Sequence, residues 1–173
     1  MMYSSLDEEL FFTQKVILKK KYQNRELALH KYFWQKTKVF PDCIIIINNF
    51  IVFFVNAKDY FKAKAYLREF RTELMERKVL ILRVEKTLVK FILNFFPDPY
   101  IHDIKLEYDE QLGLRTIIIY LYSYEERGIA IGRSGDYIKV INEILKDYVM
   151  FEEYATFKKY YIPIEVKCES INP

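Results

Sequence analysis

The pattern of apolar positions predicts strands in two parts of the chain. Cys43–Ile47 and Phe50–Val55 are apolar runs on either side of Asn48-Asn49, and asparagine accepts the left-handed conformation that a tight hairpin turn needs. Over residues 104–124 and 162–168, apolar side chains alternate with polar or aromatic ones. Alternation with period two is typical of half-buried strands. We therefore expect a hairpin at residues 43–55 and three strands after residue 100.

Apolar residues spaced three or four apart predict helices over residues 57–78, 84–95 and 138–148. Pro97 ends the second of these, because proline cannot donate a helical hydrogen bond. From residue 80 onward the expected order is helix, strand, strand, helix pair and strand. The predicted fold class is α+β, with a three-stranded sheet packed on helices and an N-terminal helical and hairpin extension.

Composition is consistent with one folded domain with extensions. Of 173 residues, 51% are hydrophobic, which is enough for a substantial core. Ile, Lys, Phe, Tyr and Asn are abundant, and their AT-rich codons suggest an organellar or parasite genome. Cys43 and Cys168 are isolated, so we expect buried reduced thiols rather than a disulfide or zinc site. The longest apolar run is too short to span a bilayer, and no membrane association is expected. No internal sequence repeat is visible.

Positive charge is concentrated near the N-terminus. The net charge is +3, yet residues 15–38 hold eight cations and only one acid, Glu26. Such a stretch predicts a basic arm that contacts nucleic-acid phosphates, although a solvated lysine-rich helix face has the same composition. The cations of this arm that we expect to bind RNA are Lys19, Lys20, Lys21, Arg25, Lys31, Lys36 and Lys38.

No pattern indicates an enzyme. His30 and His102 have no carboxylate or cysteine at ligand spacing, and nucleotide-binding, zinc-protease and serine-hydrolase motifs are absent. We therefore expect no catalytic residue, metal or cofactor. A tyrosine row on one predicted strand has two interpretations, base stacking or contact with another protein; its members are Tyr120, Tyr122 and Tyr124.

Three of the four glycines, Gly128, Gly132 and Gly135, fall within eight residues before a predicted helix. Glycine costs about 1 kcal/mol relative to alanine in a helix, so this cluster needs a physical reason. Without Cβ atoms, the backbone can approach a phosphate–sugar chain closely. The unpaired amide groups at the start of the next helix also favour anions. The segment therefore predicts a phosphate-binding loop.

This segment resembles the K-homology (KH) signature Ile-Gly-x-x-Gly-x-x-Ile-x-x-Ile, and the element order resembles the type II arrangement. Every fixed position is occupied, by Ile131, Gly132, Gly135, Ile138 and Ile141. The resemblance implies a loop that clamps single-stranded RNA beside an apolar groove. The implied loop residues are Gly132, Arg133, Ser134 and Gly135. The groove candidates, for which core packing is the alternative interpretation, are Ile129, Ile131 and Ile138.

Residues 80–170 are also similar to the N-terminal half of the ribosomal protein S-three family of the small subunit. The similarity lies in residues 103–107, 115–119 and 127–132, where two strands and a Gly-Ile-x-Ile-Gly segment follow in the same order. The sequence departs from that family at Arg127, which replaces a proline, and at Asp136, an acid beside the loop. The family's C-terminal domain has no counterpart, and two interpretations stay open: the domain is lost, or a separate chain supplies it as a partner.

The resemblance implies a structural constituent of the small ribosomal subunit, and with the codon bias we expect that subunit to be mitochondrial. Its expected partners are rRNA of the subunit head, mRNA near its point of entrance and neighbouring ribosomal proteins. The expected segments are a basic arm with a hairpin at 1–56, a connecting helix at 57–79 and a KH domain at 80–173. Two alternatives stay open: a free-standing KH factor in transcription or translation, as in Nus-type elongation factors, and a degenerate KH protein-interaction scaffold.

Overall fold

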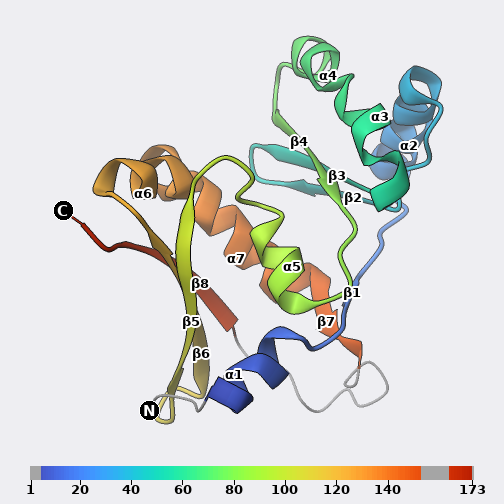
Figure 1. The fold of residues 1–173 in the computed structure, drawn as a ribbon. Helices are drawn as coiled ribbons and strands as arrows, with labels where there is room; N and C mark the ends of the chain where they lie inside the picture. The colour runs from blue at the N-terminus through green and yellow to red at the C-terminus, as the bar shows by residue number, and fades with distance from the viewer. Residues whose placement is uncertain (1–4, 153–163, 173) are drawn as a thin grey trace. The chain divides into compact units, whose positions relative to one another are not determined.

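A computed structural model describes residues 5–152 and 164–172 (Figure 1). The chain divides into two compact units. Unit 1 comprises Met1–Ile17 and Lys86–Pro173, and unit 2 comprises Leu18–Glu85. This division differs from the three segments expected at residues 1–56, 57–79 and 80–173, because residues 57–79 are not a separate connector. They belong to the same unit as the hairpin that precedes them.

Unit 2 is a three-stranded mixed sheet with helices. Strands β2 (Cys43–Ile47) and β3 (Phe50–Val55) form the predicted antiparallel hairpin, and Asn48 in its turn has φ of 49°. Strand β4 (Lys78–Arg83) lies parallel to β3, so the sheet order is β2-β3-β4. The helical segments are α2 (Asn24–Thr37), η1 (Ala57–Asp59), α3 (Tyr60–Lys64) and α4 (Leu67–Glu73).

The core of unit 2 includes the segment that was expected to be an arm. Phe33 of α2 is fully buried, and its ring centroid lies 4.7 Å from that of Phe53 on β3 and 5.2 Å from that of Phe70 on α4. Three such rings remove a large apolar area from water. The expectation of an N-terminal basic arm is therefore wrong for residues 24–37, which form a helix packed into a folded unit.

The single helix predicted over residues 57–78 is also wrong. The chain turns between α3 and α4 at Ala65 and Tyr66, and the segment ends in strand β4. The turn shifts the helical phase, so Ala63 and Phe70 are buried while Phe61, on the predicted apolar face, is 75% exposed. A periodicity count across the turn combines two short helices into one long one.

Unit 1 has a second three-stranded mixed sheet. Strands β5 (Ile101–Asp109) and β6 (Leu114–Leu121) are antiparallel, β8 (Ile164–Ser170) is parallel to β6, and the order is β5-β6-β8. The α+β class and the strands predicted after residue 100 are confirmed, although Ile162 and Pro163 of the last predicted strand lie outside the described residues. The other elements are α1 (Ser5–Phe12), β1 (Val16–Leu18), α5 (Leu88–Leu93), α6 (Tyr124–Ile131), η2 (Arg133–Gly135), α7 (Asp136–Tyr148) and β7 (Val149–Phe151).

Helix α5 is shorter than the helix predicted over residues 84–95. Leu88 and Phe91 are buried on it as expected, but the N–H of Val84 donates to the carbonyl of Val55 and extends the strand pairing of unit 2. The predicted helix over residues 138–148 is confirmed as α7, which begins two residues earlier at Asp136. Helices α6 and α7 both pack on β8.

Units 1 and 2 have the same connectivity. Apart from η1 in unit 2 and α1, β1, η2 and β7 in unit 1, each runs helix, strand, strand, helix, helix, strand, and in each sheet the first pair is antiparallel and the second parallel. In both, the two helices between the last strands pack on the final strand, β8 or β4. In unit 1 the side chain of Ser123 caps α6, and in unit 2 the side chain of Asn56 caps η1, which directly precedes α3. Seven residues after each cap an alanine is buried, Ala130 or Ala63. The chain thus contains a structural repeat.

Both cysteines are reduced and buried, as predicted. Burial raises the pKa of the Cys43 thiol to about 12 and that of the Cys168 thiol to about 11, because the thiolate loses its hydration. Among the described residues, no helix has the length and apolar character that crossing a bilayer would require.

Candidate nucleic-acid interface

The predicted glycine loop joins α6 to α7 and has an unusual backbone. Gly132 has φ of 82° and ψ of 176°, a combination open almost only to glycine, and Gly135 has φ of 70°. Ser134 between them also has a positive φ, 55°. The N–H of Gly135 donates to the carbonyl of Gly132 at 3.1 Å, which holds the loop in a tight turn. We call residues 132–135 the glycine loop.

The two glycines are needed for different reasons. A Cβ at Gly132 would lie against the carboxylate of Asp136 and 2.7 Å from the Cβ of Tyr137, so this position has no room for a side chain. A Cβ at Gly135 would find its nearest neighbour, Cγ2 of Ile138, at 3.9 Å. Gly132 therefore lets the loop pack on α7, while half-buried Gly135 has room for a side chain and is required for its positive φ.

Tyr137 anchors the loop, a role that the sequence did not indicate. Its hydroxyl donates to the carbonyl of Phe95, and its ring meets that of Phe96 edge-on with centroids 6.1 Å apart. Burial raises the pKa of this phenol, and the negative charge of Asp98 raises it further. Tyr137 lies four residues before buried Ile141 and so on the same face of α7, which is a signal that the count starting at Ile138 left out.

The predicted groove residues differ in exposure. Ile129 is 63% exposed, whereas Ile131 and Ile138 are half-buried, and Ala130 between them is buried. Core packing, the alternative interpretation, therefore does not fit Ile129. An exposed isoleucine and two partly exposed ones beside the glycine loop give an apolar surface on which a base could rest.

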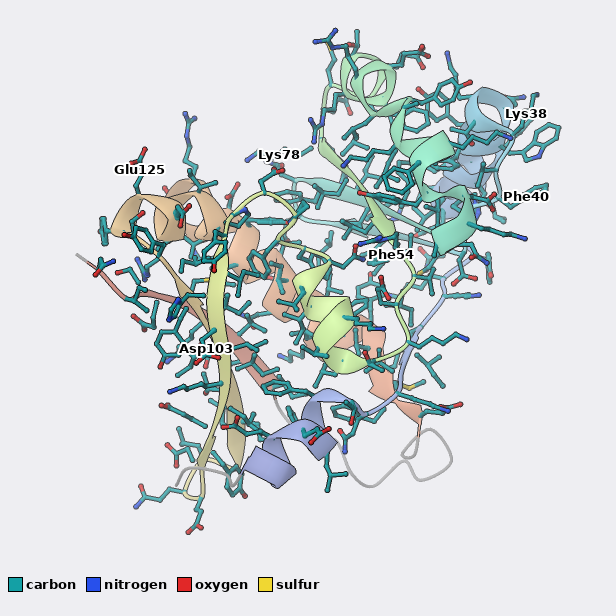
Figure 2. All side chains as sticks on the ribbon, viewed as in Figure 1. Lys38, Phe40, Phe54, Lys78, Asp103 and Glu125 are labelled. Atoms are coloured by element: carbon teal, nitrogen blue, oxygen red, sulfur yellow. The ribbon has the colours of Figure 1, made fainter. Side chains whose placement is uncertain are left out.

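Charge around the glycine loop is balanced. Residues 124–139 contain three acids and three cations. The Nε of Arg127 donates to the carbonyl of Cys168 at 2.7 Å, and Glu125 points outward from α6 (Figure 2). Arg133 and Ser134 are exposed. The N–H groups of Gly135 and Asp136 donate to carbonyls within the loop, so an anion held here would share these backbone amides, with Arg133 as the adjacent charge.

Two of the three tyrosines in the predicted row are available for contact. Tyr122 is 57% exposed and Tyr124 65% exposed, and both lie where β6 leads into α6. Tyr120 is half-buried, with the ammonium of Lys105 5.9 Å from its ring centroid. Both interpretations of the row, base stacking and protein contact, require exposed rings, and Tyr122 and Tyr124 supply them.

The predicted RNA-binding cations near the N-terminus lie in unit 2, and several have intramolecular partners. Lys20 pairs with Asp42 at 3.1 Å, and Lys36 pairs with Glu73 at 2.6 Å. These hydrogen bonds raise the pKa of each lysine. Arg25 contacts Glu26 at 3.3 Å. The remaining predicted cations are exposed on the surface: Lys19, Lys21, Lys31 and Lys38.

An exposed aromatic stack follows α2 and was not predicted. The rings of Trp34 and Phe40 stack with centroids 5.7 Å apart at 24°, and Phe40 is 73% exposed. The ammonium of Lys38 lies 4.3 Å from the Trp34 ring, and Figure 2 shows Lys38 and Phe40 at the same end of the unit. Such a cation–aromatic arrangement offers another surface for a base or for a partner's side chain.

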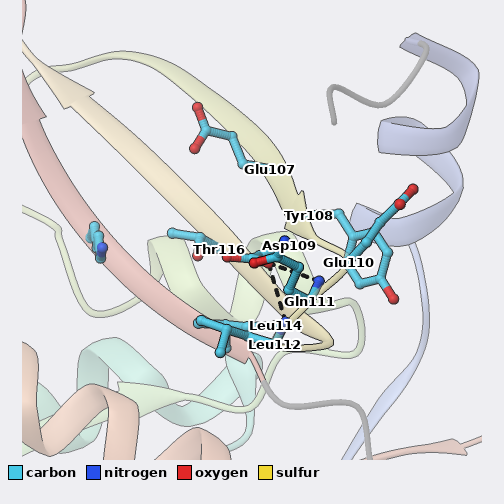
Figure 3. A pocket seen from close by; sticks show the side chains of 9 residues that line it. Glu107, Tyr108, Asp109, Glu110, Gln111, Leu112, Leu114 and Thr116 are labelled. Carbon is cyan, nitrogen blue, oxygen red and sulfur yellow. Dashed lines mark hydrogen bonds between the residues drawn. The ribbon is translucent and has the colours of Figure 1, made fainter.

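A hollow of about 800 Å³ lies at the end of the β5–β6 hairpin in unit 1 (Figure 3). Its lining includes the acids Glu107, Asp109 and Glu110. An oxygen of Asp109 accepts from the N–H groups of Gln111 at 2.9 Å and Leu112 at 3.1 Å, so this carboxylate shapes the hairpin turn. Three acids would repel phosphate, and the hollow does not suit RNA.

Comparisons with known proteins identify the fold alone. No family model matches the chain, and no curated protein matches it. The chain is similar to the solved structure of APE1850, with a TM-score of 0.59 and 20% identity over 86% of this chain and 100% of that one. The match covers more of the chain than either unit holds, so the shared fold extends over both units.

Proposed function

We propose that the chain binds single-stranded RNA and that the glycine loop contacts the RNA backbone. The observation that carries this proposal is the conformation of residues 132–135. Two glycines and a serine with positive φ form a tight turn directly before α7, in which Gly135 is half-buried and a Cβ on it would clash with nothing. Backbone amides at a helix start favour phosphate oxygens, and the missing Cβ allows close approach.

The architecture of unit 1 supports the same proposal. Helix, two strands, helix, glycine loop, helix and strand follow in the order expected of a type II KH domain, and the sheet order β5-β6-β8 suits it. Ile129 lies exposed beside the loop, where that family would hold bases. The proposal assigns binding rather than catalysis to the chain.

The test is a pair of matched glycine substitutions, Gly135→Asp and Gly113→Asp. Both glycines have positive φ, and neither Cβ would meet an atom closer than 3.9 Å, so strain and added charge are matched. Only Gly135 lies in the loop. We expect Gly135→Asp to weaken binding to an oligouridylate at least tenfold, with Gly113→Asp close to wild type. Equal affinities for the two variants would contradict the proposal.

The cellular setting is a separate proposal that rests on the sequence resemblance at residues 80–170. We propose a structural constituent of the small mitochondrial ribosomal subunit that binds rRNA of the head. The rival that the same resemblance leaves open is a free-standing RNA-binding factor in transcription or translation. Sedimentation separates them, because a ribosomal constituent must co-migrate stoichiometrically with small subunits at moderate salt, and a free factor must not.

A further inference from the structure

The structural repeat gives unit 2 a counterpart of the glycine loop. In unit 1 the loop lies between the two helices that pack on the last strand of the sheet, and in unit 2 the corresponding position is the turn between α3 and α4. Its backbone needs no glycine, because Ala65 has φ of −59° and Tyr66 has φ of −93°. We call residues 62–68 the lysine corner.

Side-chain charge distinguishes this corner from the glycine loop. Residues 57–68 hold four cations, Lys58, Lys62, Lys64 and Arg68, against one acid, Asp59. All four cations are exposed, and none of them forms an ion pair with a described residue. Two of the three predicted cations on α2 differ in this respect, since Lys36 and Arg25 have carboxylate partners.

An aromatic side chain lies among these cations. Phe61 is 75% exposed, which leaves most of an apolar ring in water, and it meets the ring of Tyr60 edge-on with centroids 5.3 Å apart. The ammonium of Lys64 lies 5.4 Å from the Tyr60 ring. Exposed cations interleaved with an exposed aromatic ring are the chemistry that holds single-stranded nucleic acid, through phosphate contacts and base stacking.

We propose that the lysine corner is a second RNA-backbone contact, in which Lys62, Lys64 and Arg68 bind phosphates and Phe61 stacks on a base. This inference rests on the proposed function of the glycine loop and extends it to unit 2. The two corners hold phosphate by different means, backbone amides in unit 1 and side-chain cations in unit 2. The second contact therefore depends much more strongly on salt.

The test measures affinity of the full-length chain for an oligouridylate across a salt series. Each phosphate neutralised on a single strand contributes about 0.7 to the slope of log affinity against log salt. Replacing Lys62, Lys64 and Arg68 together by glutamine should flatten that slope by about two units. A control that replaces the exposed Lys86, Lys90 and Lys146 by glutamine removes the same charge elsewhere and should leave the slope nearly unchanged. Lys62→Arg with Lys64→Arg should retain wild-type binding, because only the charge is required.

The outcomes separate the two proposals. Gly135→Asn should lower affinity without flattening the slope, since it adds bulk and no charge. If Gly135→Asn weakens binding and the corner variant keeps the wild-type slope, the lysine corner is not a contact and the glycine loop stands. A flattened slope with no effect of Gly135→Asn places the contact in unit 2 and overturns the function proposed for the loop. Absence of RNA binding by the wild-type chain overturns both.

Discussion

Two regions of this molecule share one connectivity and differ at the same corner. In unit 1 the corner is the glycine loop, with positive φ at three of four residues and balanced charge nearby. In unit 2 it is the lysine corner, with ordinary helical backbone and an excess of cations. A buried alanine seven residues after the helix cap is common to both. The scaffold is thus held by packing, while the exposed corner is free to vary.

The comparison teaches that one geometric position can attract anions in two ways. Glycines permit close approach of backbone amides, which act at short range and require an exact loop conformation. Lysines act through a longer-range field that salt screens, and they tolerate an ordinary turn. Substitutions that affect loop conformation should therefore matter in unit 1, and substitutions that affect charge should matter in unit 2.

The largest effect is expected from a core substitution in α2, which tests whether the basic N-terminal segment belongs to a folded unit. Phe33→Ala should lower the free energy of unfolding of unit 2 by about 4 kcal/mol, because it leaves a cavity between Phe53 and Phe70. The single tryptophan, Trp34, reports the transition by its fluorescence in a urea titration. Phe61→Ala, at an exposed phenylalanine of the same unit, should change the free energy of unfolding by less than about 0.5 kcal/mol. A flexible arm would make the two variants alike.

The next effect contrasts equivalent corner positions of the two units. Gly132→Ala should cost about 3 kcal/mol, because the new Cβ overlaps Tyr137 and φ of 82° suits almost only glycine. The reciprocal change in unit 2, Ala65→Gly, should cost only about 0.5–1 kcal/mol, the ordinary price of helical glycine. Chemical denaturation measures both. Similar losses would mean that the glycine loop is not conformationally special.

A smaller effect concerns the anchor of the glycine loop. Tyr137→Phe should cost about 1.5 kcal/mol at neutral pH, because the carbonyl of Phe95 loses its donor. Burial raises the pKa of Tyr137 above its unfolded value, so the folded state resists ionisation. The stability advantage of the wild type is complete below pH 10 and should shrink as pH rises above it. Unfolding curves of both proteins at neutral and alkaline pH test this, and a constant difference would contradict it.

The smallest expected effect comes from a substitution that removes a negative charge beside the glycine loop and so brings its charge closer to that of the lysine corner. Asp136 places a carboxylate against Gly132, where it opposes a phosphate. Removing one like charge near the ligand is worth about 1 kcal/mol, so Asp136→Asn should tighten RNA binding about fivefold. Glu125→Gln, on the outward face of α6, removes the same charge further along the helix and should change affinity less (Figure 2). Equal gains would indicate a general field effect.

Local patterns predicted the elements whose geometry is local. The Asn48-Asn49 hairpin, the strands after residue 100 and helix α7 follow from alternation, turn chemistry and helical period, and all are confirmed. The glycine loop was predictable because a backbone that needs positive φ requires glycine, and closely spaced glycines are easy to recognise in a sequence. Its conformation matches that reasoning at Gly132 and Gly135.

Long-range pairing was not predictable in the same way. Strand β4 pairs with β3, although two helices separate these strands in the sequence. Nothing in the residues of β4 itself indicates which strand it pairs with. The turn at Ala65 and Tyr66 has no glycine or proline, so two helices looked like one. The structural repeat left no trace in the sequence pattern, because the glycines of the glycine loop have no counterpart in the lysine corner. Tyr137 was missed because its partner is a backbone carbonyl 42 residues away.

The most direct test of the account follows the backbone amide signals of the isotope-labelled full-length chain as an oligouridylate is added. If both corners contact RNA, the largest shifts should fall at residues 132–138 and 62–68, and raising the salt concentration should reverse those at 62–68 first. Shifts confined to the acidic end of the β5–β6 hairpin, or none at either corner, would contradict the account.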